Sequence, residues 1–200
     1  MGKKAGLGCL VVVVLAALIA VGTGVSTYNT LVALDQGVQA QWAQVENVYQ
    51  RRADLVPNLV ETVKGAAAFE RDTFTAVTEA RAKVGQVNAG AALNNPEAFA
   101  KFQQAQDGLA SALSRLLVVV EKYPDLKATA NFRDLQAQLE GTENRIAVER
   151  KRFNETAQAF NTKRMSFPTV LIAGFFGSRF AEKSYFKAQA GAETAPPVKF

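Results

Sequence analysis

The hydrophobic pattern of the chain changes near residue 26. An uncharged apolar run extends from Ala5 to Val25 and follows the charged pair Lys3 and Lys4. A helix needs about 20 consecutive apolar residues to cross a bilayer. The run therefore predicts one N-terminal transmembrane helix over 5–25, with residues 1–4 as a short cytoplasmic segment. The alternative is a cleaved signal peptide, and the length of the run favours the uncleaved anchor.

Beyond residue 26 the apolar residues recur every three or four positions, which is the spacing of one helix face. The first such helix continues from the predicted membrane span, and its apolar face consists of Leu31, Leu34, Val38, Trp42, Val45, Tyr49, Val56, Leu59 and Val63. Arg52 takes the position between Tyr49 and Val56 on this face. Pro57 removes a backbone hydrogen bond, but the apolar spacing continues past it, so we expect a kink at Pro57.

Three more helices follow with the same spacing. The second is expected over 72–87. The third begins at Asn95-Pro96-Glu97, which supplies a cap, a first-turn proline and an acid, and it stops before Tyr123-Pro124 with a nearly heptad seam typical of a coiled coil. The fourth is expected over 131–164, and no alternating strand pattern is present. The sequence thus predicts an all-α fold, an antiparallel four-helix bundle over 26–165 with long first and last helices, preceded by one transmembrane helix.

A short apolar and basic segment, 166–187, follows the last helix. Since the first helix leaves the membrane, the fourth helix must return to it. The apolar stretch within the segment, 167–180, is too short to span a bilayer, and its basic flanks favour an interfacial anchor. The interface candidates are Phe167, Leu171, Ile172, Phe175, Phe176, Arg179 and Phe180. The alternative is a flap packed on the bundle or on a neighbouring subunit. The Ala/Gly/Pro-rich tail, 188–200, is expected to be disordered.

Composition narrows the possible chemistry. The 200 residues include no histidine and one cysteine, Cys9, so the commonest general base and any intrachain disulfide are excluded. The net charge is +5, and eight Lys and Arg residues against two acids lie between Arg150 and Lys187. This basic third favours an anionic membrane surface. Nucleic acid is not an expected partner, because the aromatic residues are not interleaved with the basic ones.

Charge and small residues also bear on orientation and assembly. Lys3 and Lys4 precede the predicted span, and no Lys or Arg follows it until Arg51. The positive-inside rule therefore places the N-terminus in the cytoplasm and the helical domain outside. Within the span, small residues recur at every fourth position, at Ala16, Ala20 and Gly24. This spacing lets membrane helices approach closely and predicts a homo-oligomer, although Ala and Gly are also abundant in such helices without pairing.

A polar layer is expected inside the bundle. If the first and last helices are antiparallel, Arg51 and Arg52 face residues 140–145. Charges in a bundle interior must pair or carry a large desolvation cost. The predicted structural layer, which would fix the register of the helices, comprises Arg51, Arg52, Asp54, Asn58, Glu140, Glu143 and Arg145.

The competing hypothesis is a ligand or metal pocket. Its carboxylates would be Glu61, Glu79, Glu121, Glu140 and Glu143. Metal sites in helical bundles usually include Glu-x-x-His, and this chain has no histidine. No nucleophile–base pair, glycine-rich phosphate loop or zinc-ligand spacing is present in the sequence. The sequence therefore predicts no catalytic residue, no metal site and no cofactor.

Several stretches carry a family resemblance. They are RRADLVPNLVETVKG at 51–65, TEARA at 78–82, EKYPDLK at 121–127, LEGTENRIAV at 139–148 and FPT at 167–169. These stretches resemble the signature of the LemA family, over residues 7–187. The resemblance implies a bacterial membrane protein with one N-terminal span and an all-helical antiparallel domain, without an established enzymatic activity. Some descriptions of the family place the helical domain in the cytoplasm, opposite to the charge pattern.

The functional prediction is an interaction protein of the bacterial plasma membrane. It would act as a self-associating envelope scaffold or adaptor, not as an enzyme. Its expected partners are membrane lipid, a second copy of the chain and another membrane or envelope protein. The alternative is a sensor that binds a small molecule or metal at the polar layer.

Overall fold

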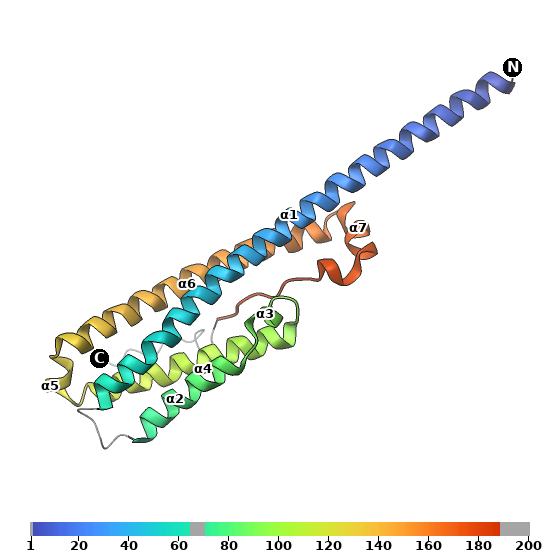
Figure 1. The fold of residues 1–200 in the computed structure, drawn as a ribbon. Coiled ribbons are helices and arrows are strands. Elements are labelled where there is room, and N and C mark those ends of the chain that lie inside the picture. Colours follow the sequence, from blue (N-terminus) through green and yellow to red (C-terminus); the bar gives the residue numbers. More distant parts are fainter. Residues whose placement is uncertain (1, 65–70, 189–200) are drawn as a thin grey trace, which may run out of the picture.

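The computed structural model describes residues 2–64 and 71–188 (Figure 1). No strand occurs among these residues, so the all-α prediction is confirmed. In chain order the elements are α1 (Gly2–Lys64), α2 (Arg71–Gln86), α3 (Ala89–Ala92), α4 (Pro96–Val120), α5 (Pro124–Lys127), α6 (Ala130–Met165), α7 (Thr169–Phe175) and the 3-10 helix η1 (Gly177–Phe180). Gly65 and all but the first residue of the predicted tail lie outside the described residues.

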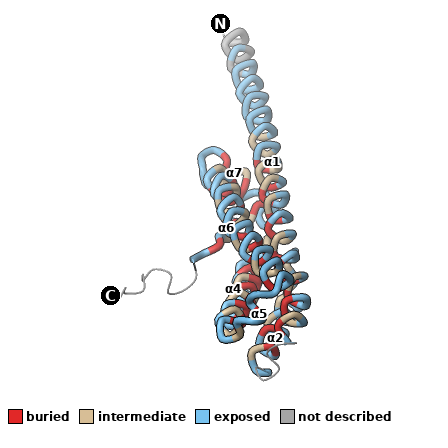
Figure 2. The backbone as a smooth tube through the Cα atoms, turned by 90° about the vertical axis from the view of Figure 1, so that its left-hand side faces the viewer, coloured by how far each residue is buried: buried red, intermediate tan, exposed pale blue. Residues whose placement is uncertain are grey.

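Helix α1 is one continuous helix of 63 residues, and it passes through Pro57 without ending. Its N-terminal part projects beyond the rest of the molecule (Figures 1 and 2). The large apolar side chains between Leu10 and Val25 are exposed there. By length and composition, α1 is the one described helix that is apolar enough to cross a membrane. The same helix then enters the folded part of the protein.

The four long helices pack as two antiparallel pairs, α1 with α6 and α2 with α4 (Figure 1). We call α2, α4, α6 and residues 26–64 of α1 the bundle. Two of its helices, α4 and α6, begin where the sequence provides caps. Asn95 accepts hydrogen bonds from the backbone N–H groups of Glu97 and Ala98 at the start of α4. Thr129 accepts one from Phe132 at the start of α6. Such caps satisfy N–H groups that have no partner within the helix.

The apolar faces predicted from the spacing form the core, which consists of two clusters. The cluster nearer the projecting part of α1, here the aromatic core, includes Trp42, Tyr49, Phe99, Phe102 and Phe153. The cluster farther from it, here the aliphatic core, is made mainly of Val and Leu side chains from α1, α2, α4 and α6. The buried Arg52, Gln106 and Thr142 lie on α1, α4 and α6, at positions between the residues of the two clusters.

The segment after α6 has two parts. Residues 166–180, including α7 and η1, form a hook at the end of the bundle nearest the projecting part of α1 (Figure 1). Residues 181–187, here the strap, then run back along the bundle without helical structure. The sequence assigned all of 166–187 to the membrane side. Within this segment Lys183 and Phe186 of the strap are buried in the bundle, and Phe186 belongs to the aromatic core.

Candidate functional site

The polar layer is built around Arg52, whose side chain is 2% exposed. Its Nη1 atom lies 3.0 Å from Oε1 of Glu143 on α6. Its Nη2 atom donates to the backbone carbonyl of Gln106 at 2.8 Å and to the Gln106 side-chain oxygen at 2.7 Å. One guanidinium thus joins α1, α4 and α6. Because a buried charge is costly unless it is paired, these contacts favour one relative position of the three helices.

The aromatic ring of Tyr49 completes this environment. The Arg52 guanidinium lies 5.1 Å from the ring centroid, within the range of a cation–π contact. Burial raises the pKa of the Tyr49 hydroxyl above its ordinary value of 10.0, and the positive charges of Arg150 and Arg52 offset part of this effect. Tyr49 is therefore neutral at physiological pH, and the charge of the layer is carried by Arg52 and Glu143.

The other predicted members of the layer lie on the outside of the bundle. These are Arg51, Asp54, Asn58, Glu140 and Arg145, all of which are exposed. Asp54 accepts a hydrogen bond from Gln50, and Glu140 accepts one from Gln136, each within its own helix. A helix turns by about 100° per residue, so the neighbours of an inward-facing residue point elsewhere. The predicted layer was too broad, and within it the structure brings together Arg52 and Glu143.

Pro57 interrupts the backbone hydrogen bonds of α1, and a side chain of α2 compensates for the loss. Because proline lacks an N–H group, the carbonyl of Ala53, four residues earlier, loses its usual helical donor. In the structure Nε of Arg81 donates to the Ala53 carbonyl at 3.0 Å. The hydrogen bond that the proline removes within α1 is thus replaced by one between α1 and α2.

The acidic pocket has no counterpart in the described residues. Glu61, Glu79, Glu121 and Glu140 are exposed, and no group of three or more His, Cys, Asp or Glu residues in 2–64 and 71–188 is placed to hold a metal ion. A cleft of about 440 Å³ does lie between α1, α2 and α4, and Gln106 lines it. Arg52 does not line this cleft.

The strap is held by contacts that the sequence analysis missed. Three side-chain amides on α4 and α6 each pair with both the N–H and the C=O of one strap residue. They are Asn161 with Lys183 (2.9 and 2.9 Å), Asn154 with Phe186 (2.9 and 2.9 Å) and Gln103 with Lys187 (3.3 and 3.0 Å). The amides therefore satisfy backbone groups of the strap as a neighbouring strand would.

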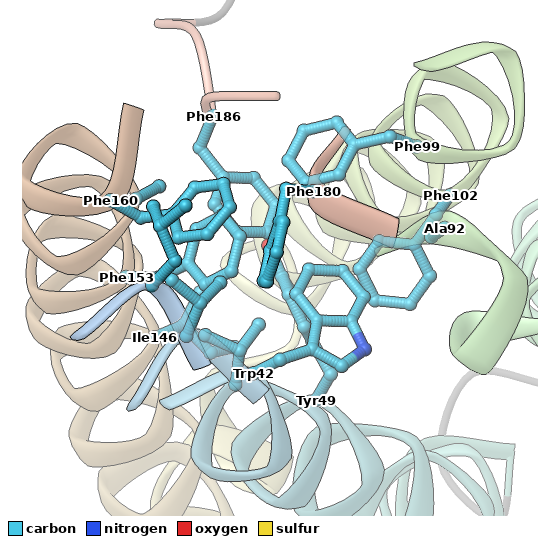
Figure 3. Close-up of a cluster of buried hydrophobic side chains, with 14 of the residues drawn as sticks. Trp42, Tyr49, Ala92, Phe99, Phe102, Ile146, Phe153, Phe160, Phe180 and Phe186 are labelled. Carbon is cyan, nitrogen blue, oxygen red and sulfur yellow. The ribbon is translucent and has the colours of Figure 1, made fainter. Parts of the chain in front are cut away.

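Buried side chains recur at every third position here. Phe180 lies just before the strap, and Lys183 and Phe186 lie within it. Ala181 has φ −60° and ψ 149°, the polyproline II conformation, in which three residues make one turn. Phe186 inserts into the aromatic core (Figure 3). This periodicity explains why one edge of the strap faces the bundle.

Lys183 forms an ion pair in which both side chains are buried. Its Nζ atom lies 2.8 Å from Oδ1 of Asp35 on α1, and the two side chains are 2% and 7% exposed. Nζ also donates to the Asn94 side chain at 3.1 Å and lies 5.3 Å from the centroid of the Phe160 ring. Asp35 occupies an inward position between Leu31 and Val38, which is the signal in the sequence that a buried acid needs a partner.

The predicted interface residues are divided by the structure. Phe167, Leu171, Phe175, Phe176 and Arg179 are exposed, and Ile172 is half-buried. Phe180 is fully buried, with its ring 5.5 Å from that of Tyr28 and 6.5 Å from that of Phe160. Phe180 is therefore part of the aromatic core and not of an interface, because the chain turns inward at η1.

The residues of the predicted helix-packing face lie on the projecting part of α1. Ala16 and Ala20 are exposed, and no atom lies within 4 Å of the position that a Cβ would take at the half-buried Gly24. This face therefore has room for another helix.

These features define a class: all-α proteins in which one long helix of membrane-spanning character continues into an antiparallel helical domain. The particular family follows from comparison with known proteins. A model of the LemA family matches residues 41–200, and the chain belongs to that family.

Three characterised relatives are similar over much of the chain. Magnetosome protein MamQ 2 of Paramagnetospirillum magneticum and magnetosome protein MamQ of Magnetospirillum gryphiswaldense are each 27% identical to it, over 92% of this chain and 74% of theirs. Protein LemA of Metamycoplasma hominis is 22% identical, over 72% of this chain and 63% of its own length.

Proposed function

We propose that this chain is a membrane-anchored scaffold that acts by binding envelope proteins and catalyses no reaction. The observation that carries the proposal is the continuity of α1 from its apolar N-terminal part into the bundle. A single helix without a linker holds the bundle at a fixed direction relative to the span. A binding surface presented in this way loses little orientational freedom when it meets a partner.

The use of the buried polar groups supports a structural role for the interior. Arg52 binds Glu143 and Gln106, Lys183 binds Asp35 and Asn94, and Asn161 binds the strap. Each of these groups is engaged with another part of the same fold. The surface of the bundle is then the part of the domain available for partners.

The proposed location is the bacterial plasma membrane, with the N-terminus in the cytoplasm and the bundle outside. The support is the pair Lys3 and Lys4 before the apolar run and the absence of Lys and Arg after it until Arg51. The names of the relatives, magnetosome protein MamQ and protein LemA, describe no reaction.

Crosslinking in intact cells tests the scaffold and its orientation together. We expect both membrane-permeant and impermeant lysine-reactive reagents, followed by mass spectrometry, to join the bundle to envelope proteins. Seven alanines inserted between Ser26 and Thr27 should keep these crosslinks, because two helical turns preserve the direction of the helix. Seven glycines should weaken them severalfold, because a flexible linker releases the bundle.

Each outcome of this experiment has a defined meaning. Crosslinks with the permeant reagent alone would place the bundle in the cytoplasm. No specific crosslink with either reagent would contradict the scaffold. Equal crosslinking of the alanine and glycine variants would show that the rigid connection is not needed.

Self-association is the second part of the proposal, and the face at Ala16, Ala20 and Gly24 supports it. Ala20→Leu is expected to reduce self-association in a membrane two-hybrid assay by about tenfold, because a bulky side chain prevents close helix approach. Gly22→Leu, which adds a leucine side chain on the opposite face of the helix, should have little effect. Equal signals from both variants would remove this face as the contact.

A further inference from the structure

The hook at residues 166–180 lies close to the point where the apolar run of α1 ends. The ring of Phe176 is 4.8 Å from the ring of Tyr28 on α1. Tyr28 is three residues beyond Val25, the last residue of the uncharged run, or about 4.5 Å along the helix axis. If α1 spans a bilayer over this run, the hook is at the level of the bilayer surface.

Helix α7 divides its residues between the protein and the outside. Thr169 and Ala173 are buried, and they anchor one face of α7. The opposite side of the hook exposes large apolar side chains, with Phe167 at 80%, Leu171 at 65% and Phe175 at 85% exposed. A contiguous patch of this kind marks an interaction site, whereas single exposed apolar residues do not.

The charges of the hook fit a lipid surface. Arg179 is exposed, and Lys163 at the end of α6 is half-buried. Arg164 is not available in the same way, because its Nε atom donates to the carbonyl of Phe180. Basic side chains beside an apolar patch are attracted to anionic headgroups while the apolar groups enter the acyl region.

We propose that the hook inserts the side chains of Phe167, Leu171 and Phe175 into the interfacial region of the same bilayer that α1 spans. The seven residues of α7 are too few to cross the membrane, so the segment lies in the surface. This inference deepens the proposed scaffold, because it rests on α1 as a membrane span. The bundle is then attached at two points, and its tilt and its rotation about α1 are both fixed.

Quenching of tryptophan fluorescence by brominated lipids tests the insertion on the full chain in nanodiscs of phosphatidylcholine and phosphatidylglycerol. The natural chain contains one tryptophan, Trp42, which is buried in the aromatic core and provides the background. Phe175→Trp is expected to lose about half or more of its added emission when the acyl chains carry bromine, since quenching requires contact with the chains. Val118→Trp is the matched control, because Val118 is an exposed apolar residue near the C-terminal end of α4, at the level of the aliphatic core.

The outcomes separate this inference from the anchor on which it rests. Quenching of Phe175→Trp no greater than that of Val118→Trp overturns the insertion. Emission of Phe175→Trp that shifts to the blue without quenching also overturns it and identifies a protein neighbour, such as a second copy. Val14→Trp, placed within the apolar run of α1, reports on the span itself, and its failure to be quenched would overturn the anchor. Circular dichroism of each variant checks that the helices are retained.

Discussion

Glu143→Ala is expected to lower the free energy of unfolding of the bundle by about 2 kcal/mol, because it removes the counter-charge of a buried cation, although the Glu143 side chain is 40% exposed and solvent screens part of the attraction. Arg52 is 2% exposed and would keep its two hydrogen bonds to Gln106. These neutral acceptors do not replace a carboxylate. Urea unfolding of the full chain in detergent micelles, followed by circular dichroism, measures the change.

Two further variants make this result specific. Glu140→Ala removes an exposed acid one turn away on the same helix and should change stability by no more than about 0.5 kcal/mol. Arg52→Leu combined with Gln106→Leu removes the buried cation together with its amide partner and should be far less damaging than Glu143→Ala. An equal loss in Glu143→Ala and Glu140→Ala would show that the ion pair does not stabilise the bundle.

Asp35→Leu is expected to release the strap, because it leaves Lys183 buried without its counter-charge. The penalty for an unpaired buried charge is about 3 kcal/mol, and a terminal segment can avoid it by moving to water. The backbone N–H groups of Lys183 and Phe186 would then lose their bonds to Asn161 and Asn154. Hydrogen exchange at these two amides should accelerate about 100-fold, which corresponds to that penalty at 1.4 kcal/mol per factor of ten.

Two control variants test whether the ion pair between Asp35 and Lys183 holds the strap. Asp54→Leu, which replaces an exposed acid on α1, should leave exchange in the strap unchanged. Asp35→Leu together with Lys183→Met should restore most of the protection, since an apolar pair can replace a buried ion pair. Unchanged protection from hydrogen exchange in Asp35→Leu alone would mean that the side-chain amides of Asn161, Asn154 and Gln103 hold the strap without the ion pair.

The helices and their inward faces could be predicted because their signals are local and repeated. Phe99, Phe102, Leu109, Leu113, Leu116 and Val120 stand three, four or seven residues apart, and all six are buried on α4. The start of α4 followed from Asn95 and Pro96 in the same way. The prediction of a buried helix face depends on many residues together, so a deviation at one position does not change which face is predicted to be buried.

The polar contacts were predicted less completely, because each depends on a single residue. Arg52 was found because it occupies an inward position, whereas Arg51 and Asp54 were included only as its neighbours. Asp35 and Gln106 occupy inward positions too, and a search for polar residues on the apolar faces would have found both. The cost of burying them made a partner necessary, even though periodicity did not say which one.

The strap could not be predicted from periodicity. Its buried residues, Lys183 and Phe186, are separated by three residues in a segment of seven, which is too short to establish a pattern. Phe180 was assigned to the interface because it is a phenylalanine in the same short segment as Phe175 and Phe176. No pattern in the sequence distinguishes it from them. The difference between them arises from the turn at η1, where Gly177 has a positive φ of 51° that favours glycine.

The strap is held in two ways. Its backbone is bound by the side-chain amides of Asn161, Asn154 and Gln103, here the amide clamps, and its side chains Lys183 and Phe186 are buried in the bundle. Asn161, Asn154 and Gln103 bind backbone N–H and C=O groups of the strap, which every residue except proline offers in the same form, and Asn161 also donates to the Tyr185 hydroxyl at 2.9 Å. The backbone part of their contribution is therefore insensitive to the side chains of Lys183, Phe186 and Lys187. Divergence between related chains can then proceed at an outward position such as Glu182 without loss of the docked conformation. Proline is the exception, because at Lys183 or Phe186 it would remove the donor that a clamp requires.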